Sequence, residues 1–167
     1  MEGKDNNVLI LLGGNLGEVA ANFKKAISLL KEVGTLNAIS GLYQSAPWGM
    51  ESKDLFYNKA LSLTTQLNAN ELLKKTQEVE QHIGRAKNKH SEGYESRVID
   101  IDILFYNFDV LKSSTLEIPH PRLHLRNFTL LPLMEIAPNF NHPILKQQVH
   151  ELLKNCPDTG WVKKVNE

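Results

Sequence analysis

The alternation of apolar and polar positions in the first 45 residues predicts a strand, a helix and a second strand. Val8 to Leu12 is a continuous apolar run that ends at Gly13-Gly14-Asn15, which is typical of a buried strand followed by a tight turn. Apolar residues then recur at helical spacing from Ala21 to Val33, and Gly34 marks the expected end of that helix. Leu36 to Tyr43 has the branched, mixed composition of a strand.

The same order of signals continues further along the chain. Phe56 to Leu67 predicts a third strand, and Asn68 is the expected N-cap of a helix from Glu71 to Ile83. Residues 87–96 predict a solvated loop that leads into a fourth strand, Arg97 to Tyr106. This β-α-β-β-α-β order predicts an α+β fold of the ferredoxin-like kind, an antiparallel sheet with two helices packed on it.

Residues 108–167 predict additions at the C-terminal side of this core. Short helices are expected near Thr129 to Ile136 and Gln147 to Leu153, with a last strand around Trp161 to Val165. The chain contains no internal repeat, and 167 residues suit one domain with a core of its own. We therefore expect a single domain over residues 1–167.

The fourth strand carries two acids in an otherwise apolar and aromatic run. Strand side chains alternate, so Asp100 and Asp102 must project from one face, roughly 7 Å apart. The opposite face is expected to hold Ile99, Ile101, Ile103 and Phe105. Carboxylates this close repel each other, and a divalent cation would remove that repulsion. A magnesium site for a polyphosphate is one interpretation, and an edge strand with an Asp-rich polar face is the other.

Basic residues gather around the same strand. All four arginines fall in a 42-residue window that also holds both aspartates, namely Arg85, Arg97, Arg122 and Arg126. The planar guanidinium fork suits phosphate oxygens, and Lys87, Lys89, His90, His120 and His124 add positive charge or hydrogen-bond donors in this window. Each alone is an ordinary solvated group, but together they favour a polyphosphate site. The glycine turn at residues 13–17 is not a P-loop, because no Gly-Lys-Ser/Thr follows.

A second group of residues suits a flat, polar ligand. A ring could stack on Phe56 while Asn58, on the same strand face, offers both a donor and an acceptor. The constrained loop that begins with Ser45, Ala46 and Trp48 precedes them. The alternative is that Trp48 and Phe56 are only core aromatics.

Composition narrows the class of protein. Nineteen basic and nineteen acidic residues cancel, so no global charge recruits nucleic acid or a membrane surface. A lone cysteine, Cys156, cannot form an internal disulfide. The chain has no apolar run near 18 residues and no signal-like start, so we expect a cytoplasmic protein, by default a monomer.

Taken in order along the chain, the motifs resemble the 6-hydroxymethyl-7,8-dihydropterin pyrophosphokinase family, and the resemblance covers most of the sequence. They are Gly13-Gly14-Asn15-Leu16-Gly17, Tyr43-Gln44-Ser45-Ala46-Pro47, Phe56-Tyr57-Asn58, Gln77-Glu78-Val79-Glu80, Gly84-Arg85, Arg97-Val98-Ile99-Asp100-Ile101-Asp102-Ile103, Ile118-Pro119-His120-Pro121-Arg122, Arg126-Asn127-Phe128 and Pro132-Leu133-Met134-Glu135-Ile136-Ala137-Pro138. Such enzymes transfer diphosphate from ATP to a pterin alcohol in folate biosynthesis, and their α+β fold agrees with the predicted element order.

The resemblance also implies roles for individual residues. Asp100 and Asp102 would hold two Mg²⁺ ions, and together with Arg85 and Arg97 they form the implied catalytic set. The implied ATP contacts are Gln77, Glu80, Arg85, Lys87, Arg97, Ile103, His120 and Arg126. The implied pterin contacts are Ser45, Ala46, Trp48, Phe56, Asn58, Asp100 and Phe128.

The implied reaction is in-line attack of the pterin hydroxymethyl oxygen on the β-phosphorus of MgATP, with AMP as the leaving group. Asp102 is the candidate to accept or relay the hydroxyl proton. The chain departs from the family pattern at Glu92-Gly93-Tyr94-Glu95-Ser96, where an arginine-tryptophan pair is common, so Lys87, Lys89 and His90 are the candidates to replace that arginine.

Three other functions remain open from the sequence. A ferredoxin-like RNA-binding module is disfavoured by zero net charge and by the acid pair. A catalytically silent domain would keep the fold without turnover. An ordinary kinase would yield ADP in place of AMP.

Overall fold

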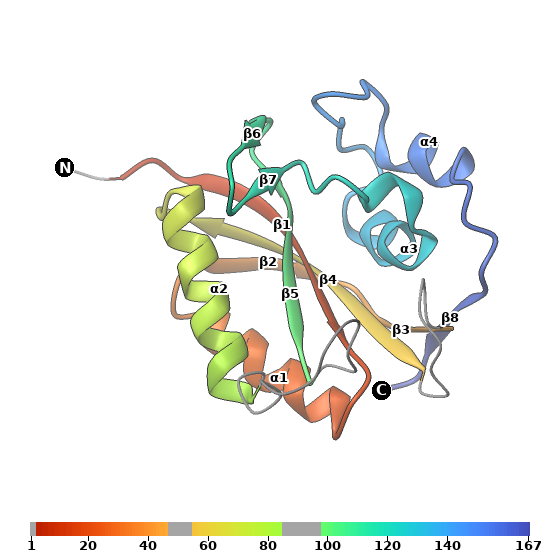
Figure 1. Ribbon diagram of the computed structural model, residues 1–167, viewed down its shortest axis with the longest axis horizontal. Helices are drawn as coiled ribbons and strands as arrows, with labels where there is room; N and C mark the ends of the chain where they lie inside the picture. Colours follow the sequence, from red (N-terminus) through yellow and green to blue (C-terminus); the bar gives the residue numbers. More distant parts are fainter. Residues whose placement is uncertain (1–2, 47–54, 85–97) are drawn as a thin grey trace.

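A six-stranded antiparallel sheet forms the centre of the molecule, which is described here by a computed structural model for residues 3–46, 55–84 and 98–167. Its strands are β1 (Asn6–Gly14), β2 (Thr35–Ile39), β3 (Leu42–Ser45), β4 (Phe56–Thr65), β5 (Asp100–Tyr106) and β8 (Val162–Val165). The strand order is β5-β1-β4-β3-β8, and β2 also pairs with β4 (Figure 1). A separate two-stranded ladder joins β6 (Leu111–Lys112) to β7 (Glu117–Ile118).

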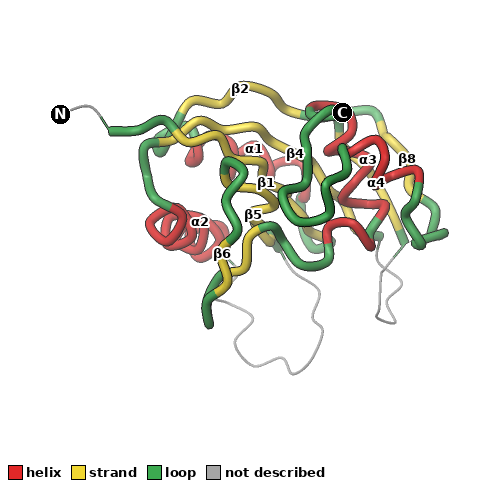
Figure 2. The backbone as a smooth tube through the Cα atoms, turned by 90° about the horizontal axis from the view of Figure 1, so that it is seen from above, coloured by secondary structure: helices red, strands yellow, loops and turns green. Residues whose placement is uncertain are grey.

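Helices cover both faces of the sheet (Figures 1 and 2). On one face lie α1 (Val19–Leu30) and α2 (Ala69–Ile83), and on the other lie α3 (Asn127–Ile136) and α4 (Val149–Lys154). A short 3-10 turn, η2 (Leu123–Leu125), leads into α3. None of the helices in the described ranges is long and apolar enough to cross a membrane.

Strand β1 separates two apolar cores because its successive side chains point to opposite faces. Ile10 and Leu12 pack with α1 and α2 in the first core. Leu9 and Leu11 pack with α3 and α4 in the second. A strand buried on both faces reads as a continuous apolar run, which is what Val8 to Leu12 is.

Local signals fixed the ends of α2 as predicted. The Asn68 side chain accepts a hydrogen bond from the Glu71 amide at 2.9 Å, and Gly84 ends the helix with a positive φ of 130°. Helix α1 instead ends at Leu30, before Gly34. Gly34 is needed for a different reason: a Cβ there would lie 2.4 Å from the Thr64 carbonyl oxygen of β4.

Two strand predictions need correction. The single strand expected at residues 36–43 is two strands, β2 and β3, because Ser40 and Gly41 lie outside the ladder and the Ser40 hydroxyl accepts from the Ala60 amide at 2.8 Å. Phe105 does not share a face with Ile101 and Ile103: it lies in the second core. The pairing of β1 with β5 shifts register between Leu9 and Ile10, and this bulge places the Phe105 side chain on the opposite face of the sheet from Ile103.

Candidate active site

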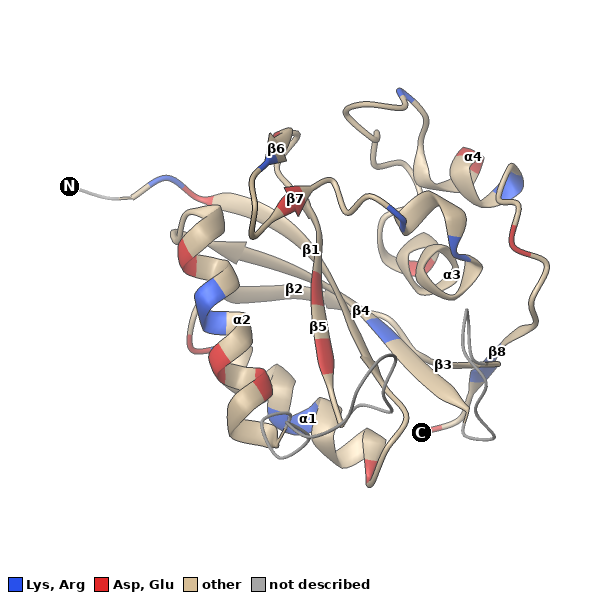
Figure 3. Ribbon diagram, viewed as in Figure 1, with Lys and Arg blue, Asp and Glu red and all other residues tan. Residues whose placement is uncertain are grey.

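The two acids of β5 lie on the face of the sheet that α3 and α4 cover, and they appear as red bands on that strand (Figure 3). Asp102 is opposite Leu11, which belongs to the second core, and directly opposed residues of an antiparallel pair share a face. Asp100 is opposite Gly13 and therefore shares that face. Both acids are half-buried. The predicted alternation of the acids is confirmed, with Ile99 and Ile101 buried behind them.

Gly13 lies between Asn58 and Asp100 in one row across three strands. It pairs with Asn58 of β4 on one side and with Asp100 of β5 on the other. Asn58 is only 5% exposed, and its Nδ2 atom donates to the Leu12 carbonyl at 3.3 Å. Because strands are about 4.8 Å apart, the Asn58 and Asp100 backbones are separated by roughly 10 Å, and Gly13 between them contributes no side chain of its own.

The space above Gly13 could not tolerate a larger residue without movement. A Cβ at this position would lie 2.9 Å from the Asn58 Nδ2 atom. The sequence predicted Gly13 as part of a turn, whereas it is a strand residue whose missing side chain leaves room for the Asn58 amide. Two consecutive glycines directly after an apolar strand were the available signal.

The predicted aromatic and amide residues also share this face. Phe56 and Asn58 are two residues apart in β4, Ser45 is opposite Phe56, and Tyr43 is opposite Asn58. Ser45 is buried, whereas Ala46 and Phe56 are half-buried. The polar and aromatic groups expected for a flat ligand therefore line the row next to Gly13.

A third set of predicted residues comes from the segment around η2. The His120 amide donates to the Leu104 carbonyl at 2.9 Å, which ties this segment to β5. The His120 Nδ1 atom accepts from the Arg122 amide at 3.1 Å. Arg126 immediately precedes α3, and its Cζ atom lies 5.6 Å from the ring centroid of Phe128.

Electrostatics keep His120 neutral at pH 7. Burial, followed by the positive charge of Arg126, lowers the pKa of His120 to about 4, against an opposing effect of Asp100. Because Nδ1 accepts a hydrogen bond, the proton of the neutral ring is on Nε2. His120 can therefore donate one hydrogen bond to an anionic ligand without carrying charge itself.

Three of the predicted nucleotide residues face the opposite side of the sheet or lie on α2. Ile103 is buried in the first core, so its side chain points away from the acids. On α2, Gln77 is exposed and Glu80 is buried. The predicted residues Trp48, Arg85, Lys87 and Arg97 lie outside the described residues, as do the alternatives Lys89 and His90.

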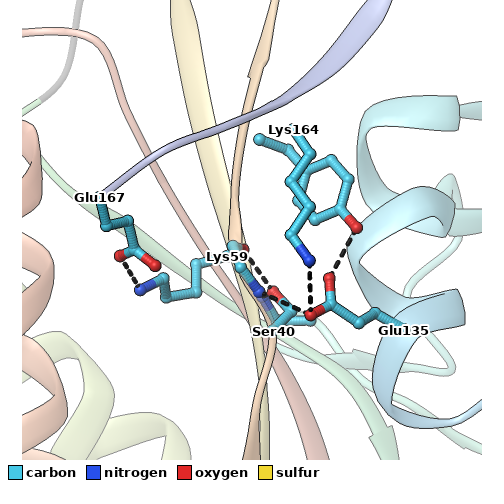
Figure 4. A network of polar contacts seen from close by, with 8 residues as sticks. Ser40, Lys59, Glu135, Lys164 and Glu167 are labelled. Carbon is cyan, nitrogen blue, oxygen red and sulfur yellow. Dashed lines mark hydrogen bonds and ion pairs between the residues drawn. The ribbon is translucent and has the colours of Figure 1, made fainter.

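Sequence reasoning missed a carboxylate that joins α3 to the sheet. Glu135 accepts hydrogen bonds from the Tyr43 hydroxyl at 2.6 Å, the Gly41 amide at 3.1 Å and the Lys164 ammonium at 3.2 Å (Figure 4). These donors outweigh the effect of burial and lower the pKa of Glu135, while burial and Glu135 raise the pKa of Tyr43 to about 12. Glu135 is 92 residues from Tyr43, so no local pattern signals the contact.

The acid pair offers few protein ligands for a metal ion. No group of three or more His, Cys, Asp or Glu side chains that could hold a metal ion occurs in the described ranges. A pair of carboxylates fits Mg²⁺, which commonly keeps several waters and shares its coordination sphere with substrate phosphates.

Comparison with known proteins gives this geometry its context. The family model for 7,8-dihydro-6-hydroxymethylpterin-pyrophosphokinase (HPPK) matches residues 9–138. A 2-amino-4-hydroxy-6-hydroxymethyldihydropteridine pyrophosphokinase of Aquifex aeolicus is 40% identical over 144 residues, which is 86% of this chain and 88% of that protein. The Folic acid synthesis protein FOL1 of Dictyostelium discoideum is 36% identical over 161 residues, which is 96% of this chain but 24% of that protein.

Solved structures agree on the fold. A crystal structure of Plasmodium falciparum HPPK-DHPS, wild type with STZ-DHP, matches with a TM-score of 0.74 and 16% identity, covering 92% of this chain and 43% of that chain. The chain thus spans less than half of that larger protein and most of the bacterial relative. Because the family model covers most of the chain, the chain belongs to the 7,8-dihydro-6-hydroxymethylpterin-pyrophosphokinase family, the ATP-dependent pyrophosphokinases of folate biosynthesis.

Proposed function

We propose that this chain binds MgATP and 6-hydroxymethyl-7,8-dihydropterin on the α3 face of its sheet and transfers the β,γ-diphosphate to the pterin, with AMP as the other product. One observation carries this proposal: the row Asn58, Gly13, Asp100 brings a buried amide, which lies over Gly13, and a half-buried carboxylate onto the same face of the sheet. That arrangement suits a flat, polar acceptor held directly beside a phosphate site.

On the pterin side, the proposal assigns stacking to Phe56 of β4 and Phe128 of α3. Asn58 and Ser45 would hydrogen-bond the polar edge, with Ala46, Trp48 and Asp100 completing the site. Asn58 and Ser45 are buried polar groups on the same face as Phe56, which supports this assignment.

On the nucleotide side, the proposal assigns phosphate and ribose contacts to His120 and Arg126. Neutral His120 would donate through Nε2, and Arg126 would supply the charge. We extend the same proposal to Gln77, Glu80, Arg85, Lys87 and Arg97. Because the Ile103 side chain is in the first core, its contact would be made by the backbone.

Two Mg²⁺ ions are proposed at Asp100 and Asp102. When bound, they would neutralise charge on the phosphates. The chain's own residues position the reactants: the aromatic pair fixes the pterin, and the amide of Asn58 fixes its orientation. The hydroxymethyl oxygen of the pterin would bond to the β-phosphorus while the bond between that phosphorus and the AMP oxygen breaks. Asp102 is proposed to accept the proton that the hydroxymethyl group loses.

Features of the whole molecule belong to the same proposal. We interpret the order β5-β1-β4-β2 with α1 and α2 as a ferredoxin-like core, and residues beyond β5 as C-terminal additions to it. The chain is proposed to act as one domain over residues 1–167, as a cytoplasmic monomer that uses neither nucleic acid nor a membrane.

The test is a product analysis with purified protein, MgATP and the pterin. We expect equal amounts of AMP and pterin diphosphate, no product without Mg²⁺, and at least about a hundredfold loss of kcat in an Asp100→Asn, Asp102→Asn double variant. Asp109→Asn is the matched control, because Asp109 is exposed just after β5. ADP as the product would indicate transfer of a single phosphoryl group and contradict the proposal.

A further inference from the structure

The two proposed aromatic walls of the pterin site come from different parts of the fold. Phe56 belongs to β4 of the sheet, whereas Phe128 is the second residue of α3, which packs over that sheet. The distance between these rings therefore depends on how α3 is held against β3 and β4. Apolar packing in the second core holds the helix there, but such packing has no directional preference of its own.

Glu135 provides a directional contact between α3 and the sheet. It lies seven residues after Phe128, or about 10 Å further along the helix. Its two carboxylate oxygens accept from different groups: Oε2 from the Tyr43 hydroxyl, and Oε1 from the Gly41 amide and the Lys164 ammonium (Figure 4). All three donors belong to the sheet side, at the start of β3 and in β8.

Tyr43 connects this contact to the proposed pterin residues. It is directly opposite Asn58 in the pairing of β3 with β4, and Ser45 follows two residues later on the same face. A hydrogen bond from Tyr43 to a carboxylate is stronger than one between neutral groups. Its short distance of 2.6 Å fits that description.

The other end of α3 is held by a different segment. The Asn127 amide donates to Asp158 Oδ2 at 3.2 Å, and the Asn127 side chain donates to the Gly160 carbonyl. These contacts fix the first turn to residues 158–160, outside the sheet. Within the described residues, the hydrogen bond of Glu135 to Tyr43 joins α3 to the strand opposite Asn58.

We propose that Glu135, acting through Tyr43, is a positioning residue for the pterin: it sets the spacing between Phe128 on α3 and the Phe56 and Asn58 wall on β4. This inference rests on the proposed function of the site. Glu135 is not itself assigned a contact with the substrate. Its effect is selective because His120, on the nucleotide side, is tied separately to β5 through the Leu104 carbonyl.

The contribution of Lys164 to this contact is small. Its side chain is 57% exposed, and exposed ion pairs add little because water screens them. Lys164→Met removes the ammonium and leaves the Tyr43 hydroxyl and the Gly41 amide on Glu135. Lys164→Met is therefore the matched control, because it removes a charged partner of Glu135 without changing Glu135 or Tyr43.

The experiment measures the KM for the pterin and for ATP, and the Kd of the pterin by calorimetry, in Tyr43→Phe, Glu135→Ala, Glu135→Gln and Lys164→Met. We expect Tyr43→Phe and Glu135→Ala to raise the pterin KM and Kd about tenfold, the loss expected for one hydrogen bond to a charged group, while the ATP KM changes less than about threefold. Glu135→Gln keeps one acceptor oxygen for Tyr43 but places its NH2 group against the Gly41 amide, which is also a donor, so it should recover only part of the pterin affinity. Lys164→Met should stay within about twofold of wild type.

Two results would overturn the inference, provided that the wild-type enzyme is active. One is an equal rise in the KM for the pterin and the KM for ATP, and the other is an unchanged pterin Kd in Tyr43→Phe. The Tyr43→Phe variant removes a single oxygen, so it remains decisive even if Glu135→Ala does not fold. If the wild-type protein neither binds the pterin nor forms AMP, the proposed function itself fails, and the inference fails with it.

Discussion

At the scale of single residues, the site depends as much on a missing side chain as on those present. Gly13 adopts ordinary strand geometry within β1, and no positive φ is recorded for it. What excludes a larger residue is the Asn58 amide on the neighbouring strand. Both Asn58 and Asp100 are paired with this glycine, so a substitution at Gly13 would disturb both the proposed pterin contact and the proposed metal site.

Gly13→Ala should therefore act through Asn58. The new Cβ would meet Nδ2 at 2.9 Å and push the amide from its place, so we expect the pterin Kd to rise about tenfold. Isothermal titration of the pterin measures this. In an Asn58→Ala background the clash is absent, so the same change should then have little further effect on affinity. Simple additivity of the two losses would contradict the mechanism.

At the scale of elements, the two helical layers have different tasks. Helices α1 and α2 pack in the first core, away from the acid face of β5, whereas α3 in the second core carries Phe128 and Glu135. Truncating a core residue in either layer should therefore lower stability, but only truncation on α3 should also weaken pterin binding.

Leu72→Ala on α2 and Leu133→Ala on α3 form a matched pair, because both leucines are fully buried. Each should lower the free energy of unfolding by about 2–5 kcal/mol, from lost burial and the cavity left behind. Urea unfolding measures that loss. Only Leu133→Ala should also raise the KM for the pterin, since only α3 bears a proposed pterin contact. An equal rise in both variants would contradict the division of tasks.

The N-cap of α2 should affect stability alone. Asn68→Ala removes the acceptor for the Glu71 amide and should cost about 1 kcal/mol of unfolding free energy. Thermal unfolding measures the change, and Asn70→Ala, at an exposed position in the first turn of the same helix, is the control. We expect kcat to remain that of the wild type in both variants.

The sequence was sufficient wherever a signal was local. Asn68 and Gly84 delimit α2 by their own conformational preferences, and the alternation around Asp100 and Asp102 identified the acid face. It was insufficient wherever a distant strand decided the outcome. The face of Phe105 follows from a register shift opposite Leu9, and no pattern within β5 encodes that shift.

The same distinction applies to the site. Phe56 and Asn58 could be placed together because they are two residues apart on one strand. The contact of Glu135 with Tyr43 could not, since it joins residues 92 positions apart through the packing of α3. Short elements such as β6 and β7 were also missed, because two residues are too few to establish a periodicity.

At the scale of the whole molecule, the half-buried His120 and the buried His142 make stability depend on pH. Burial lowers the pKa of both His120 and His142 to about 4, from the ordinary value near 6.5. Between these values the unfolded chain binds more protons than the folded protein. The free energy of unfolding should therefore be greatest above pH 6.5 and fall as the pH is lowered toward 4, by roughly 2 kcal/mol for the two groups together after allowance for solvent screening.

Urea unfolding at pH 7.5, 5.5 and 4.5 tests this dependence. His142→Asn should reduce the dependence of the free energy of unfolding on pH, because an uncharged amide replaces a ring that must otherwise be kept neutral. His82→Gln is the control, since His82 is exposed on α2. A curve for His142→Asn that parallels the wild type would exclude His142 as a source of the pH dependence.

The central place of β1 has a further consequence for how the chain reaches its fold. Ile10 pairs with Leu61 and with Ile103, partners that are 51 and 93 positions away. On the ribosome, β1 is made before either neighbour, so the backbone groups along its two edges lack their partners until β4 and β5 emerge. Such distant pairings slow folding and prolong the interval in which a strand can aggregate. We expect this nascent segment to be the one most dependent on chaperones.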